Sequence, residues 1–171
     1  MKTACVFTRE DDILKTAGRI NALTGALVAE SALLEAWYLG DAKEGLAETA
    51  RCVAGIGTVV RCPVGSGALP ENWLDSLEAL YRERQPELLI FTAGSGALAT
   101  RLAVRIGGTC LTGCRTLGRD TDGLWVRRPV YNSHADAVSR PQGRPLVLSA
   151  SKAGPVSESP VEETEQAAIT E

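Results

Sequence analysis

The sequence alternates short, continuous apolar runs with longer segments in which apolar residues recur every three or four positions. The clearest pair is the uncharged run Leu88–Thr92, followed by a segment that carries Leu98, Leu102 and Ile106. Continuous apolar runs are typical of strands buried on both faces, and a spacing of three and four indicates amphipathic helices. Strands that alternate with such helices predict a mainly parallel sheet covered by helices on both faces. We therefore expect a doubly wound α/β fold.

Proline, glycine and aspartate residues indicate where these elements are expected to begin and end. Proline is permitted in the first turn of a helix, so we expect a helix to begin at Pro70 and to continue through Tyr81. Gly107 is a typical residue for the end of a later helix, and Asp11 or Asp12 would cap the first one. Strands are expected at 4–7, 33–39, 58–62 and 88–92, and helices at 11–31, 42–54, from Pro70 and between Gly96 and Gly107.

The alternation of expected strands and helices ends at about Thr109. Short strand-like runs follow at 109–117, 123–131, 135–140 and 145–151. They are separated by the turn-forming stretches Asp120–Gly123, Asn132-Ser133 and Pro141–Gly143. Short strands with such turns at close spacing favour antiparallel hairpins. We therefore expect C-terminal antiparallel hairpin strands appended to the parallel core.

Length and composition bound the organisation of the chain. A chain of 171 residues can bury enough surface for one self-supporting core. We assign residues 1–154 to this domain. Residues 155–171 carry five glutamates, two prolines and no basic residue, which predicts an acidic, flexible tail or linker.

Charge is distributed unevenly along the chain. The net charge is −3, which argues against a protein that binds nucleic acid. Residues 101–154 nevertheless hold nine basic and three acidic side chains. An anionic ligand, an acidic partner and simple solvation are all compatible with this basic block.

Signals for membrane insertion and export are missing from the sequence. No apolar run approaches the length of about 20 residues that a bilayer-spanning helix needs, and the N-terminus lacks the apolar stretch of a signal peptide. We expect no membrane association and a cytoplasmic location. Five cysteines, an odd number, then predict reduced thiols, most of them buried. Because His134 is the one histidine, a metal site would lack ligands and none is expected.

One turn is a candidate ligand site. Gly94-Ser95-Gly96 links an expected strand to an expected helix at the carboxyl edge of the sheet, where such folds bind ligands and a helix N-terminus favours anions. The segment lacks the full G-x-G-x-x-G pattern and the Gly-Lys-Ser/Thr ending of a phosphate loop. The acidic stretch Thr8–Asp12 is expected to face it and would repel a phosphate. A plain tight turn and a contact with a ligand or partner both fit this segment.

The residues needed for nucleophilic catalysis do not come together in the sequence. No G-x-S-x-G elbow occurs, and His134 has Asp136 two residues away on the same expected strand face, with no nucleophile assigned. Trp125 and Tyr131 are expected in core or interface packing rather than against a cofactor. We therefore expect no catalytic residue in this chain and no enzyme activity of its own.

Several stretches together resemble the N-terminal domain of the electron transfer flavoprotein alpha subunit. Leu88–Gly108 is similar to the family's strand, turn and helix, with Thr100–Ala103 inside the helix. Cys110–Cys114 stands where the family has its next strand. Leu124–Ala135 is similar to the family's Val-Arg-x-Arg-Pro-Val-Tyr-Gly-Gly-Asn-Ala element, and Ser159–Glu163 to the linker after the domain. The resemblance implies a Rossmann-like fold of the adenine nucleotide alpha hydrolase-like type.

The chain also departs from the family pattern. Asn132-Ser133-His134 replaces the family's Gly-Gly-Asn, and the aspartate expected near residue 113 is missing. The family's second domain, which holds most of the FAD site, follows the linker, whereas this sequence ends at Glu171. The resemblance therefore implies FAD in an assembled complex and no cofactor bound by this chain alone.

The function implied by the resemblance is that of an electron transfer flavoprotein alpha-like subunit or fragment. It would be a scaffold domain that pairs with a beta-like subunit, with a separate FAD-binding domain and a dehydrogenase as further partners. Arg127, Arg128 and Tyr131 are candidates for partner docking, and Gly94, Ser95 and Gly96 are candidates for cofactor binding. The alternative is a stand-alone α/β domain that binds an adenine nucleotide or a similar small ligand.

Overall fold

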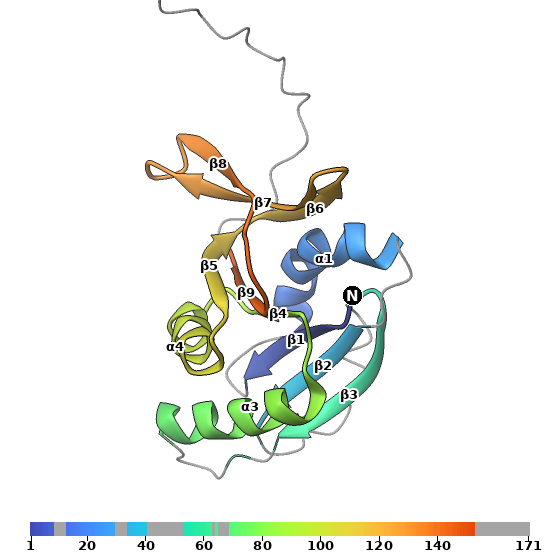
Figure 1. Cartoon of the computed structure of the whole chain (residues 1–171), viewed down its shortest axis with the longest axis vertical. Helices are drawn as coiled ribbons and strands as arrows, with labels where there is room; N and C mark the ends of the chain where they lie inside the picture. The colour runs from blue at the N-terminus through green and yellow to red at the C-terminus, as the bar shows by residue number, and fades with distance from the viewer. Residues whose placement is uncertain (9–12, 30–33, 41–52, 63, 65–68, 153–171) are drawn as a thin grey trace, which may run out of the picture.

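In the part of the chain that it describes, the computed structural model follows the expected order of elements from the N-terminus to the end of α4 (Figure 1). It describes residues 1–8, 13–29, 34–40, 53–62, 64 and 69–152. The strands in this part of the chain are β1 (Thr3–Thr8), β2 (Leu34–Leu39), β3 (Ile56–Cys62), β4 (Leu88–Phe91), β5 (Thr109–Cys114), β6 (Thr116–Asp120), β7 (Gly123–Val130), β8 (Ala135–Ser139) and β9 (Leu146–Ala150). The helices are α1 (Ile13–Ala29), α3 (Pro70–Arg84) and α4 (Gly96–Ile106).

Six strands form one parallel sheet in the order β3-β2-β1-β4-β9-β5. The chain builds outward from β1 through β2 to β3 and then returns to place β4 on the other side of β1. This reversal makes the carboxyl ends of β1 and β4 a topological switch point. The prediction of a doubly wound α/β fold with a mainly parallel sheet is confirmed.

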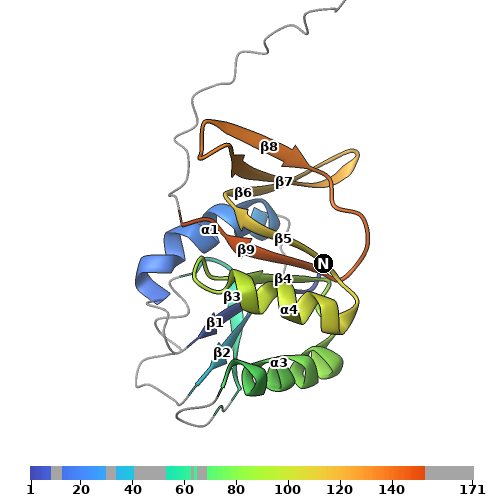
Figure 2. The same cartoon turned by 90° about the vertical axis from the view of Figure 1, so that its left-hand side faces the viewer.

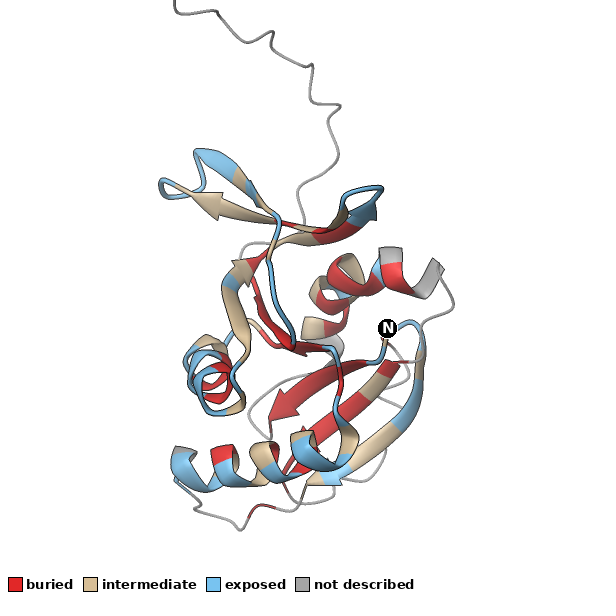
Figure 3. Cartoon of the chain, viewed as in Figure 1, coloured by how far each residue is buried: buried red, intermediate tan, exposed pale blue. Residues whose placement is uncertain are grey.

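Alternating side chains explain why these strands read as continuous apolar runs. On β1, Cys5 and Phe7 pack in the core cluster that contains α1, whereas Ala4 and Val6 pack in the cluster that contains α3 and α4. All four side chains are fully buried. Figure 3 shows the central strands buried while the outward faces of α3 and α4 are exposed. Both faces of the sheet are therefore covered by helices, as predicted.

Two helix ends lie at the proline and the glycine that the sequence indicates. Pro70 is the first residue of α3, and Gln85 ends that helix in the left-handed conformation with φ 47°. Gly107 ends α4 at φ 67°. Asp11, Asp12 and most of the expected helix at 42–54 lie outside the described residues. None of the helices in the described segments is long and apolar enough to cross a bilayer.

Two strands that the sequence predicts in antiparallel hairpins belong to the parallel sheet instead. The run at 145–151 forms β9, which lies between β4 and β5 and pairs with both in parallel. The run at 109–117 is divided into β5, at the edge of this sheet, and the start of β6. A bulge between Leu111 and Cys114, with Gly113 at φ 70°, accompanies this change of direction. The hairpin prediction was wrong here because β9 is buried on both faces, as a central parallel strand must be.

The other predicted hairpin strands form a separate three-stranded antiparallel sheet, β6-β7-β8. Leu117, Leu124 and Val126 on its inner face are buried and join the core cluster that contains α1. Because side chains alternate along β7, Trp125 and Arg127 point away from that core. Figure 2 shows this sheet as the outermost described layer on its side of the molecule.

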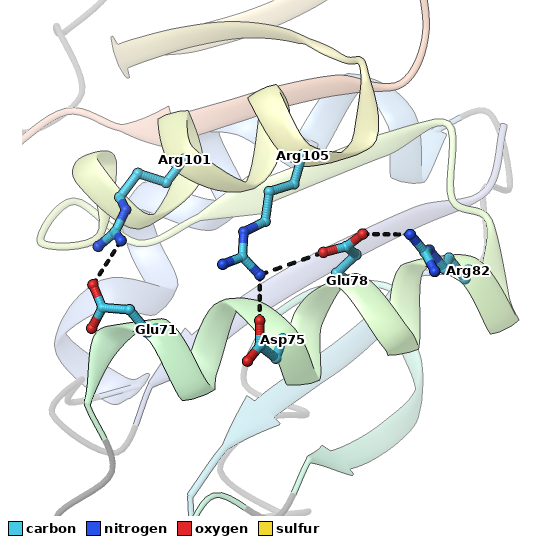
Figure 4. Close-up of polar contacts among 6 residues, drawn as sticks. All are labelled: Glu71, Asp75, Glu78, Arg82, Arg101 and Arg105. Carbon is cyan, nitrogen blue, oxygen red and sulfur yellow. Dashed lines mark hydrogen bonds and ion pairs between the residues drawn. The ribbon is translucent and has the colours of Figure 1, made fainter.

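Ion pairs join α3 to α4 over the opposite face of the parallel sheet (Figure 4). Arg101 donates to Glu71 at 2.7 Å, and Arg105 pairs with Asp75 and, at 3.4 Å, with Glu78. The Arg101 guanidinium holds the pKa of the Glu71 carboxyl below its usual value. Exposed pairs of this kind contribute little to stability, so the buried leucines of the two helices carry most of the packing.

Candidate functional site

The Gly94-Ser95-Gly96 turn connects β4 to α4 at the carboxyl edge of the parallel sheet, where the sequence predicts it. Ser95 is the N-cap residue of α4, but its side chain makes no capping hydrogen bond. Its hydroxyl instead lies 3.1 Å from the Thr92 hydroxyl, and its N–H donates to the Thr92 carbonyl oxygen at 3.1 Å. Thr92 therefore holds the turn closed.

Ser149, near the end of β9, lies against this turn. Its hydroxyl accepts a hydrogen bond from the Gly113 N–H at 3.2 Å. A Cβ placed on Gly96 would come within 3.3 Å of the Ser149 Oγ, so the close approach depends on the missing side chain. The sequence predictions missed Ser149 because they place its strand in a hairpin. The uninterrupted apolar run Leu146–Leu148 is the signal that could have found it.

Buried hydroxyl residues line the carboxyl edge of the parallel sheet. Thr8 ends β1, Thr92 follows β4, and Ser149 and Ser151 lie at the end of β9, each of them no more than 6% exposed. The groups are neutral, and those of Thr92 and Ser149 are engaged within the protein. Residues 9–12, where the sequence predicts an acidic loop facing the turn, lie outside the described residues.

The thiols near this edge are unsuited to nucleophilic chemistry. Burial raises the pKa of Cys5 to about 12 and that of Cys114 to about 12, although the charge of Arg128 opposes the shift at Cys114. A thiol with so high a pKa stays protonated at neutral pH and is a poor nucleophile. The described cysteines are free, with Cys5 and Cys114 buried and Cys62 and Cys110 partly buried. The fifth cysteine lies outside the described residues.

The three predicted docking residues lie on the antiparallel sheet, away from the Gly94-Ser95-Gly96 turn, and do not share one face. Arg127 stacks over the Trp125 ring, with its guanidinium carbon 6.0 Å from the ring centroid. Arg128 is the next residue of β7 and points to the opposite face, where its charge reaches Cys114. Tyr131 follows the strand and is 82% exposed, so it is not a core residue.

Aspartates neutralise part of the predicted basic block. Arg115, whose side chain is only 10% exposed, pairs with Asp136 at 3.1 Å. Arg140 donates twice to Asp120, at 2.7 Å and 2.7 Å, and its guanidinium lowers the pKa of that carboxyl. These two arginines are therefore held within the fold, whereas Arg127 stacks on Trp125 and forms no ion pair with the described residues.

Trp125 lies across Gly118, its partner on β6. The indole ring occupies the space where a side chain at residue 118 would begin, so this glycine is required for the contact. Gly118 is itself buried beneath the ring. The sequence predicts that Trp125 packs either in the core or at an interface. It lies on the outer side of the sheet and outside the core cluster, so packing at an interface is the alternative that remains.

The expectation that His134 and Asp136 lie on the same face of one strand is wrong, because His134 precedes β8. His134 lies in the turn before β8, and its N–H donates to the Tyr131 carbonyl oxygen at 3.1 Å. Asp136 is engaged with Arg115. Among the described residues, no group of three or more histidine, cysteine, aspartate or glutamate side chains is placed to hold a metal ion.

The described side chains at the carboxyl edge of the sheet offer neutral hydroxyls rather than cations to the pyrophosphate of a flavin. A pyrophosphate needs cationic side chains or N–H groups held open for it. The hydroxyls of Thr92, Ser95 and Ser149 at the carboxyl edge are instead bonded to one another or to the backbone. A shallow pocket of about 310 Å³ lies elsewhere, between the β6–β7 turn and the loop after β8, and its Arg140 is occupied by Asp120.

Comparison with known protein families gives a match over most of the chain. A family model described as the electron transfer flavoprotein domain matches residues 13–171. No curated protein matches the chain. The family match covers the described elements from α1 through β9, and β1 precedes the matched range.

Proposed function

Because the chain belongs to the electron transfer flavoprotein domain family, we propose that it is an alpha-like scaffold component of a flavin-dependent electron transfer complex. In this role it pairs with a beta-like subunit, and FAD is bound in the assembled complex, with a separate FAD-binding domain and a dehydrogenase as further partners. The chain contributes a folded surface rather than a reaction centre, so it catalyses no reaction on its own.

The observation that carries this proposal is that hydroxyl groups at the carboxyl edge of the parallel sheet are hydrogen-bonded within the protein. In a doubly wound fold this edge is the usual place for a ligand. Here Thr92 closes the turn before α4, and the Ser149 hydroxyl is held by the Gly113 N–H. Cys5 and Cys114 are protonated by burial. Because these hydroxyl groups already form hydrogen bonds within the protein, they support a role in which the flavin is held by another part of the complex.

The resemblance of Leu124–Ala135 supports the alpha-like assignment. Arg127, Pro129 and Tyr131, which match the family's element, lie on β7 and at its end. The free thiols of the described cysteines are consistent with the cytoplasmic location that we propose for the complex.

Co-expression with the beta-like subunit of the same organism tests this function. We expect the two chains to elute together on size exclusion and the complex with its FAD-binding domain to show a flavin absorption spectrum. We also expect a dehydrogenase to reduce that flavin. A chain that stays monomeric in the mixture, or that holds stoichiometric FAD by itself, would contradict the proposal.

A second candidate function is the binding of an adenine nucleotide by the isolated domain. The observation that favours it is the position of the Gly94-Ser95-Gly96 turn, which precedes the N-terminus of α4 at the carboxyl edge of the sheet. Binding of AMP or ATP to the folded state would raise the unfolding temperature as the nucleotide concentration increases. An unchanged unfolding temperature at millimolar nucleotide would exclude this candidate.

A further inference from the structure

We propose that the outer face of the antiparallel sheet is the docking surface for a partner protein that presents carboxylates around an apolar patch. This inference rests on the proposed function and adds the location and the chemistry of the interface. We call this surface the Trp125 face. It is formed by Gly118, Trp125, Arg127 and Val138, which share one side of the sheet because they are partners or alternate neighbours in the register.

The Trp125 face is separated from the core by the sheet itself. Leu117, Leu124 and Val126 on the inner side are buried against the cluster that contains α1. On the outer side, Val138 is 58% exposed although it is a large apolar residue in a strand. In Figures 1 and 2 no described element lies beyond this side of the sheet. The described residues therefore leave this face uncovered.

The side chains of the Trp125 face are those that carry binding energy in protein interfaces. Tryptophan, tyrosine and arginine are enriched among such residues, which are surrounded by a polar rim that excludes water. Trp125 lies flat on Gly118 and is covered by Arg127, so its ring is ordered before a partner binds. A side chain that is already ordered loses less conformational entropy on binding.

The rim of this face consists of ion pairs. Arg140 bonds Asp120 at the carboxyl ends of β8 and β6, and Arg115 bonds Asp136 at the amino ends of the same two strands. Asp122 also lies 3.8 Å from Arg140. These pairs fix the edges of the surface and leave few charges at its centre, as in the polar rim of a specific interface.

Charge identifies the partner as acidic. On the Trp125 side of the sheet, the carboxylates of Asp120 and Asp136 are neutralised by Arg140 and Arg115, so Arg127 adds a positive charge that they do not balance. Within the described part of the chain, Arg127 has an aromatic neighbour but no carboxylate partner. A second copy of this chain, related by a twofold axis on this face, would bring equal positive charges together. A partner surface with carboxylates complements the face, favours a fast encounter and fixes the orientation.

Binding of the co-expressed beta-like subunit to substituted chains tests this surface. We expect Val138→Glu to weaken the affinity at least tenfold, because its carboxylate meets an acidic partner. Val138→Lys should weaken it less, since it changes the shape in a similar way but attracts that partner. Trp125→Ala and Arg127→Gln should each weaken binding several-fold. Val104, which is 79% exposed on α4, gives the matched control, and Val104→Glu should bind within twofold of the unsubstituted chain.

Two further measurements locate the contact and check the fold. Hydrogen exchange of the complex should show protection in β7 and β8, and the association rate should fall with salt more steeply for the unsubstituted chain than for Arg127→Gln. The unfolding temperature of each variant is compared with that of the unsubstituted chain. A loss of binding counts only for variants that are folded.

The possible results separate this inference from the proposed function. If the complex forms and Val138→Glu binds as well as the unsubstituted chain, the surface is wrong although the function stands. If Val138→Lys weakens binding as much as Val138→Glu, the partner is not acidic and the inference is overturned. A chain that dimerises by itself through this face, shown by a monomeric Val138→Glu variant, would also overturn it. If no complex forms at all, both the function and the surface are rejected.

Discussion

Ser149 accepts a hydrogen bond from the Gly113 N–H at 3.2 Å, so a side chain of β9 fixes the bulge in the neighbouring strand β5. The Ser149 side chain is buried, and this bond leaves it little freedom to move. Its Oγ also lies 3.3 Å from the position that a Cβ on Gly96 would take. The first residue of α4 and the bulge of β5 are therefore coupled through one hydroxyl.

Gly96→Ala tests this coupling. Alanine favours a helix, but here its methyl group would press on a fixed hydroxyl, so we expect the free energy of unfolding to fall by about 1 kcal/mol. In the Ser149→Ala background the same substitution should cost less, because the obstructing atom is gone. Gly94→Ala is the control, since no atom lies within 4 Å of a Cβ at that position. Urea unfolding of the four variants measures the coupling, and equal effects of Gly96→Ala in both backgrounds would contradict it.

The buried thiols predict a loss of stability at high pH. Burial raises the pKa of Cys5 and of Cys114 from 9.0 to about 12. Above pH 9 the unfolded chain therefore loses thiol protons that the folded chain retains, so the stabilisation is complete below pH 9 and is lost as the pH rises toward 12. We expect each thiol to contribute a slope of up to about 1.4 kcal/mol per pH unit in that interval. Urea unfolding between pH 8 and 10.5 should show a shallower slope for Cys5→Ala or Cys114→Ala than for the unsubstituted chain.

The same burial predicts the order in which the cysteines react. Iodoacetamide at pH 8 should leave Cys5 and Cys114 unmodified in the folded protein, since neither thiol is accessible or ionised. Cys62 and Cys110 are partly buried and also have a raised pKa, so they should react slowly. Mass spectrometry of digests distinguishes the sites. Rapid modification of Cys114 in folded protein would show that β5 and β9 separate in solution.

The parallel core could be predicted from the sequence because its signals are local. Pro70 begins a helix for a reason that needs no tertiary contact, and Leu88–Phe91 is apolar along its whole length because both of its faces are buried. The position of β9 depends on a pairing between residues 36 or 37 positions apart in sequence, from the segments Thr109–Cys114 and Leu146–Ala150. Turn residues indicate where a chain reverses, but they do not tell which strand it joins afterwards.

The candidate sites were predictable in part for the same reason. The Gly94-Ser95-Gly96 turn follows from one strand and one helix that are adjacent in sequence. The contact of Ser149 with Gly113 follows only from the sheet order, and the contact of Trp125 with Gly118 follows only from the antiparallel register. Charge counts could not reveal that Asp136 and Asp120 neutralise two arginines of the basic block, because that depends on where the side chains lie.

Gly118→Ala tests the packing beneath Trp125. A methyl group at this position would occupy the space of the indole ring, which must then leave the sheet. We expect the free energy of unfolding to fall by about 1–3 kcal/mol and the tryptophan fluorescence to shift toward that of exposed indole. Gly25→Ala on α1 is the control, because no atom lies within 4 Å of a Cβ there. A Gly118→Ala protein with unchanged fluorescence and stability would show that the ring does not rest on this glycine.

The ion pair between Arg101 and Glu71 predicts a small acid sensitivity. Arg101 lowers the pKa of the Glu71 carboxyl, so the pair stabilises the fold above the usual carboxyl pKa of 4.5 and is lost as the pH falls through the lowered value. Both side chains are about half exposed, so the effect is small and weakens in salt. The unfolding temperature of Arg101→Gln should lie slightly below that of the unsubstituted chain at pH 7 and converge with it near pH 2. A difference that persists at pH 2 would indicate a packing role for Arg101 instead.

The turn between β7 and β8 places three consecutive residues with side chains in the left-handed region. Tyr131, Asn132 and Ser133 have φ values of 49°, 54° and 70°. This conformation costs an L-residue about 1 kcal/mol, less for asparagine, whereas glycine adopts it freely. Ser133→Gly therefore removes strain from the folded state, although the greater freedom of glycine in the unfolded chain offsets part of the gain.

We expect Ser133→Gly to raise the free energy of unfolding by about 0.5 kcal/mol in urea titrations. Ser139→Gly is the matched control, because Ser139 lies in β8, where glycine weakens a strand, and it should lower the free energy of unfolding by about 0.5–1 kcal/mol. Opposite signs for the two substitutions follow only if Ser133 is held at positive φ in solution. If both substitutions destabilise the protein equally, the turn that presents Tyr131 at the end of the sheet has a different conformation.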